Sequence, residues 1–343
     1  MKISHTLLTI VVPCYEEQEV INKTIEQLTI QLNKLVEENL ISDKSKLLFV
    51  DDGSKDGTWT LIAKACATNR YVTGLKLSRN VGHQTALIAG LKRAQEKSSC
   101  AISIDADLQD DINVIRDFVL KYHEGYDVVY GVRRSRKTDT HFKRITAQGF
   151  YRVMNKLGIN LVYNHADYRL MSKRVLEELN QYQEEKLFLR GILPMIGFKT
   201  TKVMYDRKER YAGDTKYPIK RMLSFAFDGI TSFSIAPIRF ITYLGFFLFF
   251  LGGIAGMYAI IQKIIGNTDA GWTSLMISIW LLGGLQLMGT GIIGEYIGRI
   301  FMEVKKRPKY AIDIDLYTDK DPFQYLRTTT STIIPGKKLQ MKK

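Results

Sequence analysis

Two aspartates and a glutamine follow the apolar run "CAISI" with a spacing that suits a single cation. Asp105, Asp107 and Gln109 stand at every second position of "DADLQ", so in an extended loop their oxygens can approach the same side. Carboxylate and amide oxygens are hard ligands that suit Mg²⁺ or Mn²⁺, and these ions complete their coordination with water and substrate phosphate. A solvated acidic turn is the alternative, but the position at the end of an apolar run favours a metal site.

Other charged loops also follow short apolar runs. Asp51 and Asp52 close "KLLFV", where a carboxylate can accept hydrogen bonds from a base or a ribose. The arginines of "VRRSRK", beginning with Arg133, can neutralise phosphate through forked hydrogen bonds, with a solvated basic loop as the alternative. Asp110 and Asp111 are interpreted as N-caps of the helix predicted for "INVIRDFVL".

The elements that must position these residues alternate along the first 135 residues. Short apolar runs predict strands, and stretches such as "INKTIEQLTIQLNKL" carry apolar residues at three- and four-residue steps, which predicts amphipathic helices between them. This alternation implies an α/β fold with a mostly parallel sheet and helices on both faces, whose ligands bind beyond the carboxyl ends of the strands. Two acidic loops and one basic loop therefore meet at one edge, a pattern typical of a site for metal and phosphate. The predicted strands are 7–12, 46–50, 72–77, 100–104 and 127–131.

Two strongly apolar segments, 240–262 and 272–294, run for 23 residues each without a charged side chain. A helix of that length is about 35 Å long, enough to cross a hydrocarbon core of about 30 Å. Buried helices of a soluble protein are the alternative, but two such runs in succession favour a membrane hairpin. Lys and Arg concentrate before the first run and after the second, which predicts that both the N-terminal part and the C-terminal tail are cytosolic.

The formal net charge of +14 raises the question of nucleic-acid binding. Attraction between juxtamembrane Lys and Arg and anionic lipids explains the charge more simply, so membrane lipids rather than nucleic acid are the expected partners. The three cysteines show no C-x-x-C spacing and are expected to be reduced, structural thiols. The N-terminal "LLTIVV" is too short for a signal peptide and predicts a strand.

The predicted organisation has four parts. Residues 1–218 form the cytosolic α/β domain, 219–238 a juxtamembrane amphipathic helix, 239–298 the two membrane helices, and 299–343 a basic cytosolic tail that is weakly ordered beyond Tyr310. "GTGIIG" at 289–294 matches a dinucleotide-binding pattern, but its place inside an apolar segment excludes that function. Its glycines instead favour close helix packing and a homo-oligomer, with a tetramer as one option.

Seven segments occur in the order expected of one enzyme family. They are "VVPCYEE", "VDDGSKDGT", "RNVGHQTAL", "DADLQDD", "ADYRLMS", "RYAGDTKY" and "GEYIGRIFMEVKKRP". The chain resembles the family-2, GT-A-fold glycosyltransferases that load a sugar onto a polyprenyl phosphate, above all the bacterial bactoprenol (undecaprenyl-phosphate) glucosyltransferases, to which dolichol-phosphate mannose synthases are related. The resemblance extends from Leu8 to Tyr310. Glu16, where the family usually has Asn, and Asp111, where it often has Pro, are departures that bear on the donor rather than on the reaction type.

The resemblance implies a role for each matching residue. Asp105, Asp107 and Gln109 would hold the Mg²⁺ or Mn²⁺ that bridges the donor diphosphate. The residues around the nucleotide would be Pro13, Tyr15, Glu17, Asp51, Asp52, Asp105, Ala106 and Arg133. The acceptor phosphate would meet Asp167, Arg169, Arg210 and Lys216. Catalysis would depend on Asp105, Asp107, Arg133, Arg210 and Lys216.

By the same resemblance the enzyme would transfer a hexose with inversion from a UDP-sugar, first of all UDP-glucose, to undecaprenyl phosphate at the bacterial plasma membrane. The lipid-linked monosaccharide would serve the modification of cell-surface glycan, teichoic acid or O-antigen, with a separate flippase and a downstream transferase as further partners. The acceptor is a phosphate monoester with a second pKa of about 6, so its oxygen is anionic and needs no strong protein base. His83 precedes the helix "QTALIAGLK" and is expected at a helix start or a sugar contact rather than as that base.

Three alternatives are weighed against this function. The donor could be UDP-N-acetylglucosamine or another nucleotide hexose. A processive polysaccharide synthase would share the fold and the D-x-D motif, but it would normally show a Q-x-x-R-W sequence, absent here, and more than two spans. A non-catalytic membrane scaffold that binds nucleotide belongs to another class, and the intact set of Asp105, Asp107, Arg210 and Lys216 argues against it.

Overall fold

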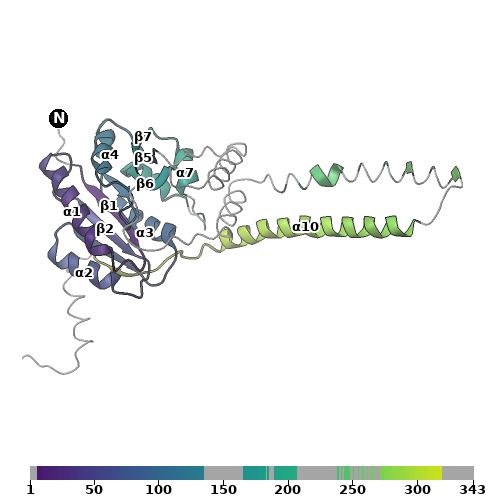
Figure 1. Cartoon of the computed structure of the whole chain (residues 1–343), viewed down its shortest axis with the longest axis horizontal. Coiled ribbons are helices and arrows are strands. Elements are labelled where there is room, and N and C mark those ends of the chain that lie inside the picture. Colours follow the sequence, from purple (N-terminus) through teal and green to yellow (C-terminus); the bar gives the residue numbers. More distant parts are fainter. Residues whose placement is uncertain are drawn as a thin grey trace, which may run out of the picture. The chain divides into compact units, whose positions relative to one another are not determined.

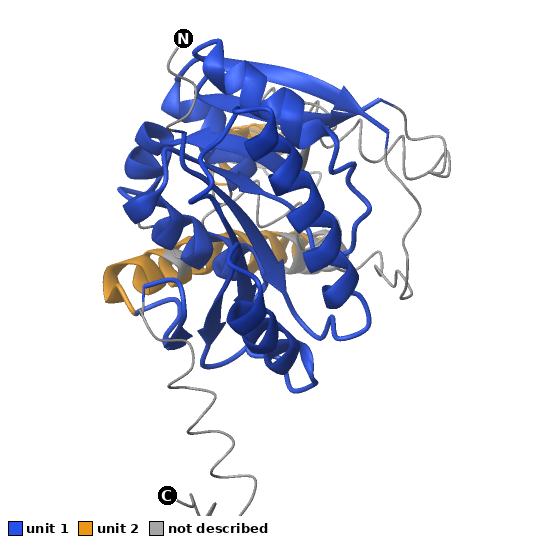
Figure 2. Ribbon diagram, turned by 90° about the vertical axis from the view of Figure 1, so that its left-hand side faces the viewer, with its two compact units in different colours: residues 1–151, 160–216, 308–343 blue, residues 152–159, 217–307 orange. Residues whose placement is uncertain are grey.

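The computed structural model describes residues 6–134, 165–182, 184, 189–206, 243–247 and 271–318, together with single residues and short pairs between 238 and 265. The chain divides into two compact units (Figure 2). Unit 1 contains residues 1–151, 160–216 and 308–343, and unit 2 contains residues 152–159 and 217–307. All of the site residues predicted from the sequence belong to unit 1.

An eight-stranded sheet forms the centre of unit 1, in the order β7-β5-β6-β4-β1-β2-β3-β8. Figure 1 shows this part of the chain, with β1, β2, β5, β6 and β7 labelled. The pairs β1–β2, β1–β4, β2–β3 and β5–β7 are parallel, whereas β6 and β8 run antiparallel to their neighbours. The predicted mostly parallel sheet is therefore confirmed. The strands are β1 (Leu8–Cys14), β2 (Lys46–Asp51), β3 (Val72–Leu77), β4 (Cys100–Ser103), β5 (Val128–Arg133), β6 (His165–Ser172), β7 (Thr200–Tyr205) and β8 (Ile312–Asp315).

Helices that connect these strands bury one apolar face each. In α1 the buried side chains include Ile21, Leu28 and Leu35, which recur at the predicted helical spacing. The helix α3 approaches the sheet closely at Gly90, where a Cβ would lie 2.4 Å from Val11 Cγ1. The described helices of unit 1 are α1 (Ile21–Glu37), α2 (Thr58–Thr68), α3 (His83–Lys97), α4 (Val114–His123), α6 (Lys173–Leu179) and α7 (Leu189–Ile196).

Five strands agree with their predicted ranges to within two residues, and three strands were not predicted. The largest difference concerns the C-terminal tail, which was expected to be weakly ordered beyond Tyr310. Ile312–Asp315 instead forms β8 along the edge of β3, and Leu316 N donates to Gly74 O at 2.9 Å. The expectation was wrong for this segment because its alternating isoleucines and aspartates suit an edge strand with one face against the core.

The carboxyl edge of the parallel strands collects the loops that the sequence singled out. β1, β2, β4 and β5 all end at this edge, and β6 starts there because it runs antiparallel between β4 and β5. Ser103, the last residue of β4, pairs with Arg169 of β6, so Asp167 lies beyond the end of β4. The acidic loops after β2 and β4 and the start of the basic loop after β5 therefore share one edge, as predicted.

In unit 2 the structure describes one long helix, α10 (Trp272–Lys305). It begins at the first residue of the second apolar segment and exposes large side chains such as Leu282, Leu287 and Ile297. Among the described residues, no helix combines the length and the hydropathy that crossing a membrane requires. The first apolar segment, 240–262, and the amphipathic helix predicted for 219–238 fall mostly outside the described residues.

Candidate functional site

The loop that follows β4 carries the predicted acidic residues at the carboxyl edge of the sheet. Ile104 still donates its N–H to Val11 O (3.1 Å), so the chain leaves the sheet at Asp105. Gln109 N donates to Asp107 Oδ1 (3.1 Å), and Leu108 between them has a φ of +55°. Because a left-handed conformation is unfavourable for leucine, this tight turn must be stabilised by its surroundings. The turn keeps the three predicted metal ligands in one short loop.

Several charged groups surround Asp105. Burial, followed by the neighbouring carboxylates of Asp110, Asp167 and Asp107, raises the pKa of Asp105 to about 6, while His83 acts in the opposite direction. His83 Nε2 lies 3.4 Å from Asp105 Oδ1, and 37% of the Asp105 side chain is exposed. A group of carboxylates that repel one another at an accessible position is an environment that a bound cation would stabilise.

The ligands that this loop offers fit a hard divalent cation that shares its coordination with a substrate. In the part of the chain that the structure describes, no group of three or more His, Cys, Asp or Glu side chains is arranged to hold a metal ion. The two carboxylates and the amide of Asp105, Asp107 and Gln109 would thus need water and substrate oxygens to complete the coordination. Mg²⁺ is commonly bound in this way, through one or two carboxylates and substrate phosphate.

Asp110 forms a cluster with Arg133 and Tyr205, which come from the ends of β5 and β7. The Asp110 carboxylate is buried, its Oδ1 accepts a hydrogen bond from Tyr205 Oη at 2.5 Å, and the same oxygen lies 3.3 Å from Arg133 Nη2. Arg133 Nε also donates to Tyr205 Oη (3.3 Å). Asp110 therefore fixes the guanidinium of Arg133 at the carboxyl edge, where the sequence predicts that this arginine contacts phosphate.

The helix after the acidic loop begins later than predicted. α4 starts at Val114, and Asn113 is its N-cap residue without a side-chain capping hydrogen bond. Asp111 lies before the helix and accepts the Asn113 N–H through Oδ1 (3.3 Å). The predicted capping roles of Asp110 and Asp111 are therefore wrong. Asp110 contacts Arg133 and Tyr205, and Asp111 stabilises the turn that precedes the helix.

A second acid–arginine cluster lies at the start of β6. Arg190 contacts Asp167 twice, from Nε to Oδ1 (3.2 Å) and from Nη2 to Oδ2 (3.0 Å), and Arg169 Nη2 also contacts Asp167 Oδ1. Burial raises the pKa of Asp167, but Arg190 and Arg169 outweigh burial and hold this pKa well below its usual value. Arg190 was not predicted as a site residue, because a single arginine in the apolar stretch "FLRGILPMIG" gives no local sign of its partner.

Arg169 is fully buried, and this changes the interpretation of its role. Its Nε and Nη1 atoms have no hydrogen-bond partner among the described residues. A side chain with no exposed surface is better placed to orient Asp167 than to meet an acceptor phosphate. The structure thus favours a positioning role for Arg169 over the contact that the resemblance implies.

The two aspartates after β2 differ in what they bind. Asp52 holds the loop before α3, because Val81 N donates to its Oδ1 (2.8 Å) and Gly82 N to its Oδ2 (2.9 Å). Asp51 Oδ1 lies 3.4 Å from Ser54 N, while Asp51 Oδ2 is buried and has no hydrogen-bond partner in the described part of the chain. Burial raises the pKa of both carboxyls. Asp51 thus leaves one buried carboxylate oxygen without a partner among the described residues, whereas Asp52 shapes the site.

The other predicted nucleotide contacts lie in or next to the end of β1, or in the acidic loop: Pro13, Tyr15, Glu17 and Ala106. Tyr15 is 41% exposed and free to pack against a flat ligand. Ala106 is buried, and its carbonyl accepts a hydrogen bond from Thr24 Oγ1 (2.7 Å). Glu16 has a φ of +54°, a conformation that Asn adopts more readily, so the departure from the family at this position carries some strain.

Two predicted acceptor residues, Arg210 and Lys216, lie outside the described residues. The arrangement described here is therefore the part of the site formed by the loops after β1, β2, β4 and β5 and by the start of β6. It brings together Asp51, Asp105, Asp107, Arg133 and Asp167 at one edge. The roles of Arg210 and Lys216 stay predictions.

Gly53→Ala is expected to lower the free energy of unfolding by at least about 2 kcal/mol. Gly53 has a φ of +68°, and a Cβ there would lie 2.5 Å from Arg79 C and 2.6 Å from Asn80 N. These are backbone atoms of the loop that Asp52 holds, so the loop would have to move. Denaturant unfolding measures the loss. Gly125→Ala is the matched control, because Gly125 has a φ of +87° but open space around it. An equal loss of unfolding free energy in both variants would show that the contact with Arg79 and Asn80 is not the cause.

The comparisons with other sequences agree over most of the chain. Residues 9–180 match Glycosyl transferase family 2, and residues 236–300 match the GtrB C-terminal hairpin. YkoT, an uncharacterized glycosyltransferase of Bacillus subtilis (strain 168), is 70% identical over 320 residues, which cover 93% of this chain and 95% of that protein. The prophage bactoprenol glucosyl transferase homolog of Escherichia coli (strain K12) is 41% identical over 310 residues, 89% of this chain and 98% of that protein. The bactoprenol glucosyl transferase of Shigella phage SfII is 40% identical over 310 residues, 89% of this chain and 97% of that protein.

Among solved structures, glucosyl-3-phosphoglycerate synthase from Mycobacterium tuberculosis, crystallised in complex with Mn²⁺, uridine diphosphate and phosphoglyceric acid, is similar with a TM-score of 0.46 and 17% sequence identity. The similarity covers 66% of this chain and 76% of that chain.

Proposed function

The chain belongs to glycosyl transferase family 2 and is a glycosyltransferase, and we propose that it transfers a hexose from a UDP-sugar to undecaprenyl phosphate. The acceptor is proposed because relatives that share about 40% identity over 89% of this chain are named bactoprenol glucosyl transferases. UDP-glucose is the first candidate donor, and UDP-N-acetylglucosamine is the second. The product would be a lipid-linked monosaccharide that serves cell-surface glycan, teichoic acid or O-antigen modification.

The observation that carries this proposal is the group of carboxylates around Asp105 at the carboxyl edge of the sheet, next to the fixed arginine Arg133. We assign Asp105, Asp107 and Gln109 to a bound Mg²⁺ or Mn²⁺, which would stabilise the negative charge of a departing diphosphate. Arg133 uses two of its nitrogens on Tyr205 and Asp110, and its side chain remains 25% exposed. It therefore keeps N–H donors for a phosphate oxygen.

The remaining residues would bind and orient the two substrates. Asp51 Oδ2, buried and without a partner among the described residues, would accept a hydrogen bond from the nucleobase. Arg210 and Lys216 are proposed to attract the acceptor phosphate, and Asp167, held by two arginines, to define the surface that faces it. Because the acceptor oxygen is already anionic near neutral pH, positioning for an in-line attack would account for much of the rate increase.

We further propose that the protein is a multi-pass protein of the bacterial plasma membrane with its catalytic domain in the cytosol. The match of residues 236–300 to a C-terminal hairpin and the exposed apolar side chains of α10 support this proposal. The boundaries predicted from the sequence, 1–218, 219–238, 239–298 and 299–343, are retained as part of it. A homo-oligomer, a separate flippase and a downstream transferase are the further partners we propose.

The experiment that tests the function is a donor screen with purified full-length protein. Undecaprenyl phosphate, Mn²⁺ or Mg²⁺, and a panel of labelled nucleotide sugars are incubated with the protein, and the lipid products are separated and identified by mass spectrometry. The expected result is a hexosyl phospholipid from UDP-glucose. A glycolipid formed only from UDP-N-acetylglucosamine would correct the donor, whereas UDP binding without glycolipid from any donor would refute the transfer reaction in favour of a nucleotide-binding scaffold.

Asp110→Asn is expected to raise the KM for the nucleotide sugar about tenfold, because a lost charge-assisted hydrogen bond is worth about 1.5–3 kcal/mol. The substitution leaves the shape of the side chain but removes the charge that fixes Arg133. Tyr205→Phe, which removes only the hydroxyl of the same cluster, is expected to have a smaller effect. Steady-state kinetics at varied donor concentration measure both. An unchanged KM in Asp110→Asn would show that Arg133 does not depend on this cluster.

A further inference from the structure

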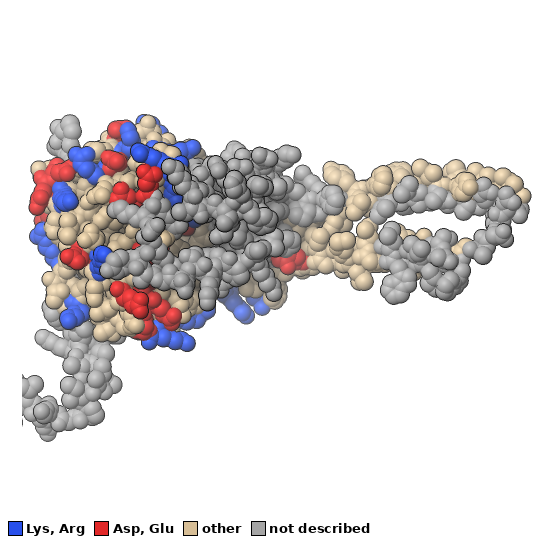
Figure 3. All heavy atoms as spheres, in the orientation of Figure 1, with Lys and Arg blue, Asp and Glu red and all other residues tan. Residues whose placement is uncertain are grey.

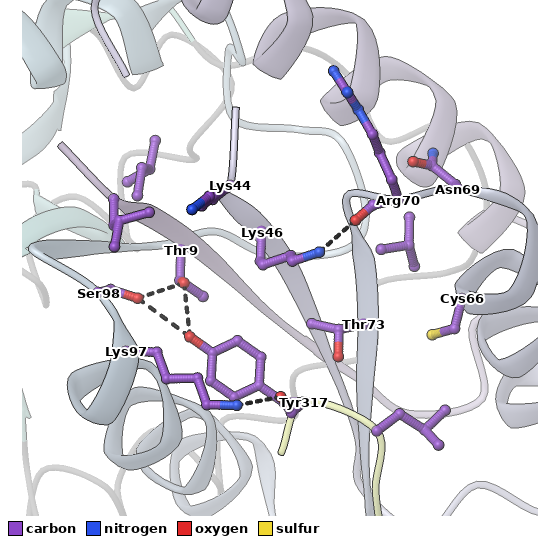
Figure 4. Close-up of a pocket in the computed structure, with 14 residues that line it drawn as sticks. Thr9, Lys44, Lys46, Cys66, Asn69, Arg70, Thr73, Lys97, Ser98 and Tyr317 are labelled. Carbon is purple, nitrogen blue, oxygen red and sulfur yellow. Dashed lines mark hydrogen bonds between the residues drawn. The ribbon is translucent and has the colours of Figure 1, made fainter. Parts of the chain in front are cut away.

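A cavity lies at the edge of the sheet opposite to the acidic loop. Its volume is about 410 Å³, within the range of about 300–1,000 Å³ typical of sites for small molecules. It is lined by residues at the starts of β1, β2 and β3, by the chain around the C-terminal end of α2, by the segment before β4, and by the chain that follows β8 (Figure 4). All of these segments belong to unit 1, and none of them carries a residue of the proposed transferase site.

The charged side chains that line the cavity are all cationic. They are Lys44, Lys46, Arg70 and Lys97, and neither Asp nor Glu is among the described lining residues. On the face of the molecule that Figure 3 shows, Lys and Arg are interspersed with Asp and Glu. The exclusively cationic lining of the cavity differs from that mixed surface. Burial lowers the pKa of Lys46, and the cations of Arg70 and Lys97 lower it further. Cations that disfavour one another in this way would be stabilised by a bound anion.

Hydrogen-bond donors in the cavity are only partly used. Lys46 Nζ donates to Arg70 O (2.5 Å) and Lys97 Nζ to Tyr317 O (2.9 Å), and each ammonium group has three N–H bonds to offer. Thr73, which also lines the cavity, is 5% exposed, and its hydroxyl has no hydrogen-bond partner among the described residues. A buried hydroxyl without a hydrogen-bond partner is unfavourable, so a ligand oxygen that bonds to the Thr73 hydroxyl would be stabilising.

The chain that follows β8 forms one wall of the cavity. The Tyr317 hydroxyl lies 3.2 Å from Thr9 Oγ1 and 3.3 Å from Ser98 Oγ, and these two hydroxyls are 2.6 Å apart (Figure 4). The ring of Tyr317 also lies 5.1 Å from Lys97 Nζ. The cavity therefore depends on the return of the C-terminal segment to the sheet, and it is shaped by contacts between residues more than 200 positions apart.

We propose that this cavity binds a small, multiply charged phosphate compound through Lys46, Lys97 and the hydroxyl of Thr73. Several cations with no carboxylate among the described lining residues match a ligand with more than one negative charge, and lysine and arginine bind phosphate oxygens through charge-assisted hydrogen bonds. The volume exceeds what a single phosphate ion needs, so the ligand is a diphosphate or an organic phosphate. The same chemistry occurs in free phosphate compounds and in lipid headgroups.

The test measures binding of pyrophosphate to the full-length protein by isothermal titration calorimetry. EDTA is present, so that no complex of metal and pyrophosphate forms at the acidic loop after β4. Lys46→Gln and Lys97→Gln are each expected to weaken binding about tenfold or more, since each removes a charge-assisted hydrogen bond. Lys92→Gln, an exposed lysine of α3 that does not line the cavity, is the matched control and should bind as the unaltered protein does.

Two further variants separate this cavity from the transferase site. Thr73→Val, which keeps the shape of the side chain but removes the hydroxyl, should weaken binding, whereas Asp107→Ala should leave it unchanged. A second series replaces pyrophosphate with dihexanoyl phosphatidic acid, and tighter binding of that lipid would identify a headgroup as the source of the phosphate. Absence of pyrophosphate and lipid binding, or binding that persists in Lys46→Gln and Lys97→Gln, would overturn the proposal.

Discussion

Asp107→Ala is expected to reduce the rate of glycosyl transfer by about 10²–10³-fold or more, while the free energy of unfolding changes by less than about 1 kcal/mol. Asp107 is only partly buried, and its Oδ1 accepts a hydrogen bond from Gln109 N (3.1 Å) within the same loop. Because the side chain is partly exposed, removing its carboxylate is expected to affect the fold little. It deprives the proposed cation of one of two charged ligands, and so weakens the group that would stabilise the leaving diphosphate.

The matched control for this variant is Asp117→Ala. Asp117 is an exposed aspartate in the first turn of α4, ten positions along the chain, and should be dispensable for transfer. Initial rates at saturating Mn²⁺ or Mg²⁺, together with a titration of Mn²⁺ in the presence of UDP, measure the two variants. The metal titration matters because a defect of the active-site shape alone would leave Mn²⁺ affinity unchanged. If Asp107→Ala transfers sugar at the rate of Asp117→Ala, the assignment of this loop to the metal is wrong.

Local patterns were sufficient to predict much of the α/β fold. The strands β1 to β5 are short apolar runs with helices of regular spacing between them, and both signals depend only on neighbouring residues. The strands β6, β7 and β8 gave weaker signals for separate reasons. β6 contains the buried Arg169, β7 alternates exposed and half-buried residues, and β8 is an edge strand of isoleucine and aspartate. In each case the strand is stabilised by the neighbour with which it pairs, and that neighbour is distant in the sequence.

The position of the site could be predicted from the sequence, but the pairing of its side chains could not. The carboxyl-edge rule placed the loops after β2, β4 and β5 together, because it follows from strand direction alone. It could not say which side chains would pair across those loops. Asp110 meets Arg133 and Tyr205, 23 and 95 positions away, and therefore does not cap α4 as its local sequence suggests. Likewise Asp167 meets Arg190 of α7, a partner that no spacing rule indicates.

Asp167→Ala is expected to lower the free energy of unfolding by about 3–5 kcal/mol, the usual cost of removing one partner from a buried ion pair. Arg169 has no exposed surface, and Arg190 beside it carries the same charge. Without Asp167, the buried guanidinium of Arg169 would lose its ion-pair partner and lie beside a second arginine. Denaturant unfolding at pH 7 measures the loss. Glu38→Gln breaks the exposed pair between Glu38 and Arg116 and should cost no more than about 1 kcal/mol.

Two measurements distinguish an uncompensated charge from a simple loss of packing. In the double variant Asp167→Ala with Arg169→Met, the buried charge is absent, so the total loss should be smaller than the sum of the two single losses. The second measurement is pH. Because the arginines hold the pKa of Asp167 below its unfolded value of about 4, its stabilisation is complete above that pH and decreases as the pH falls below it. The difference between the unaltered protein and Asp167→Ala should therefore narrow in acid. The opposite outcome would be additive losses of unfolding free energy and a difference between the two proteins that does not change with pH. It would mean that Asp167 acts through packing alone, and that Arg169 is stabilised by residues other than Asp167.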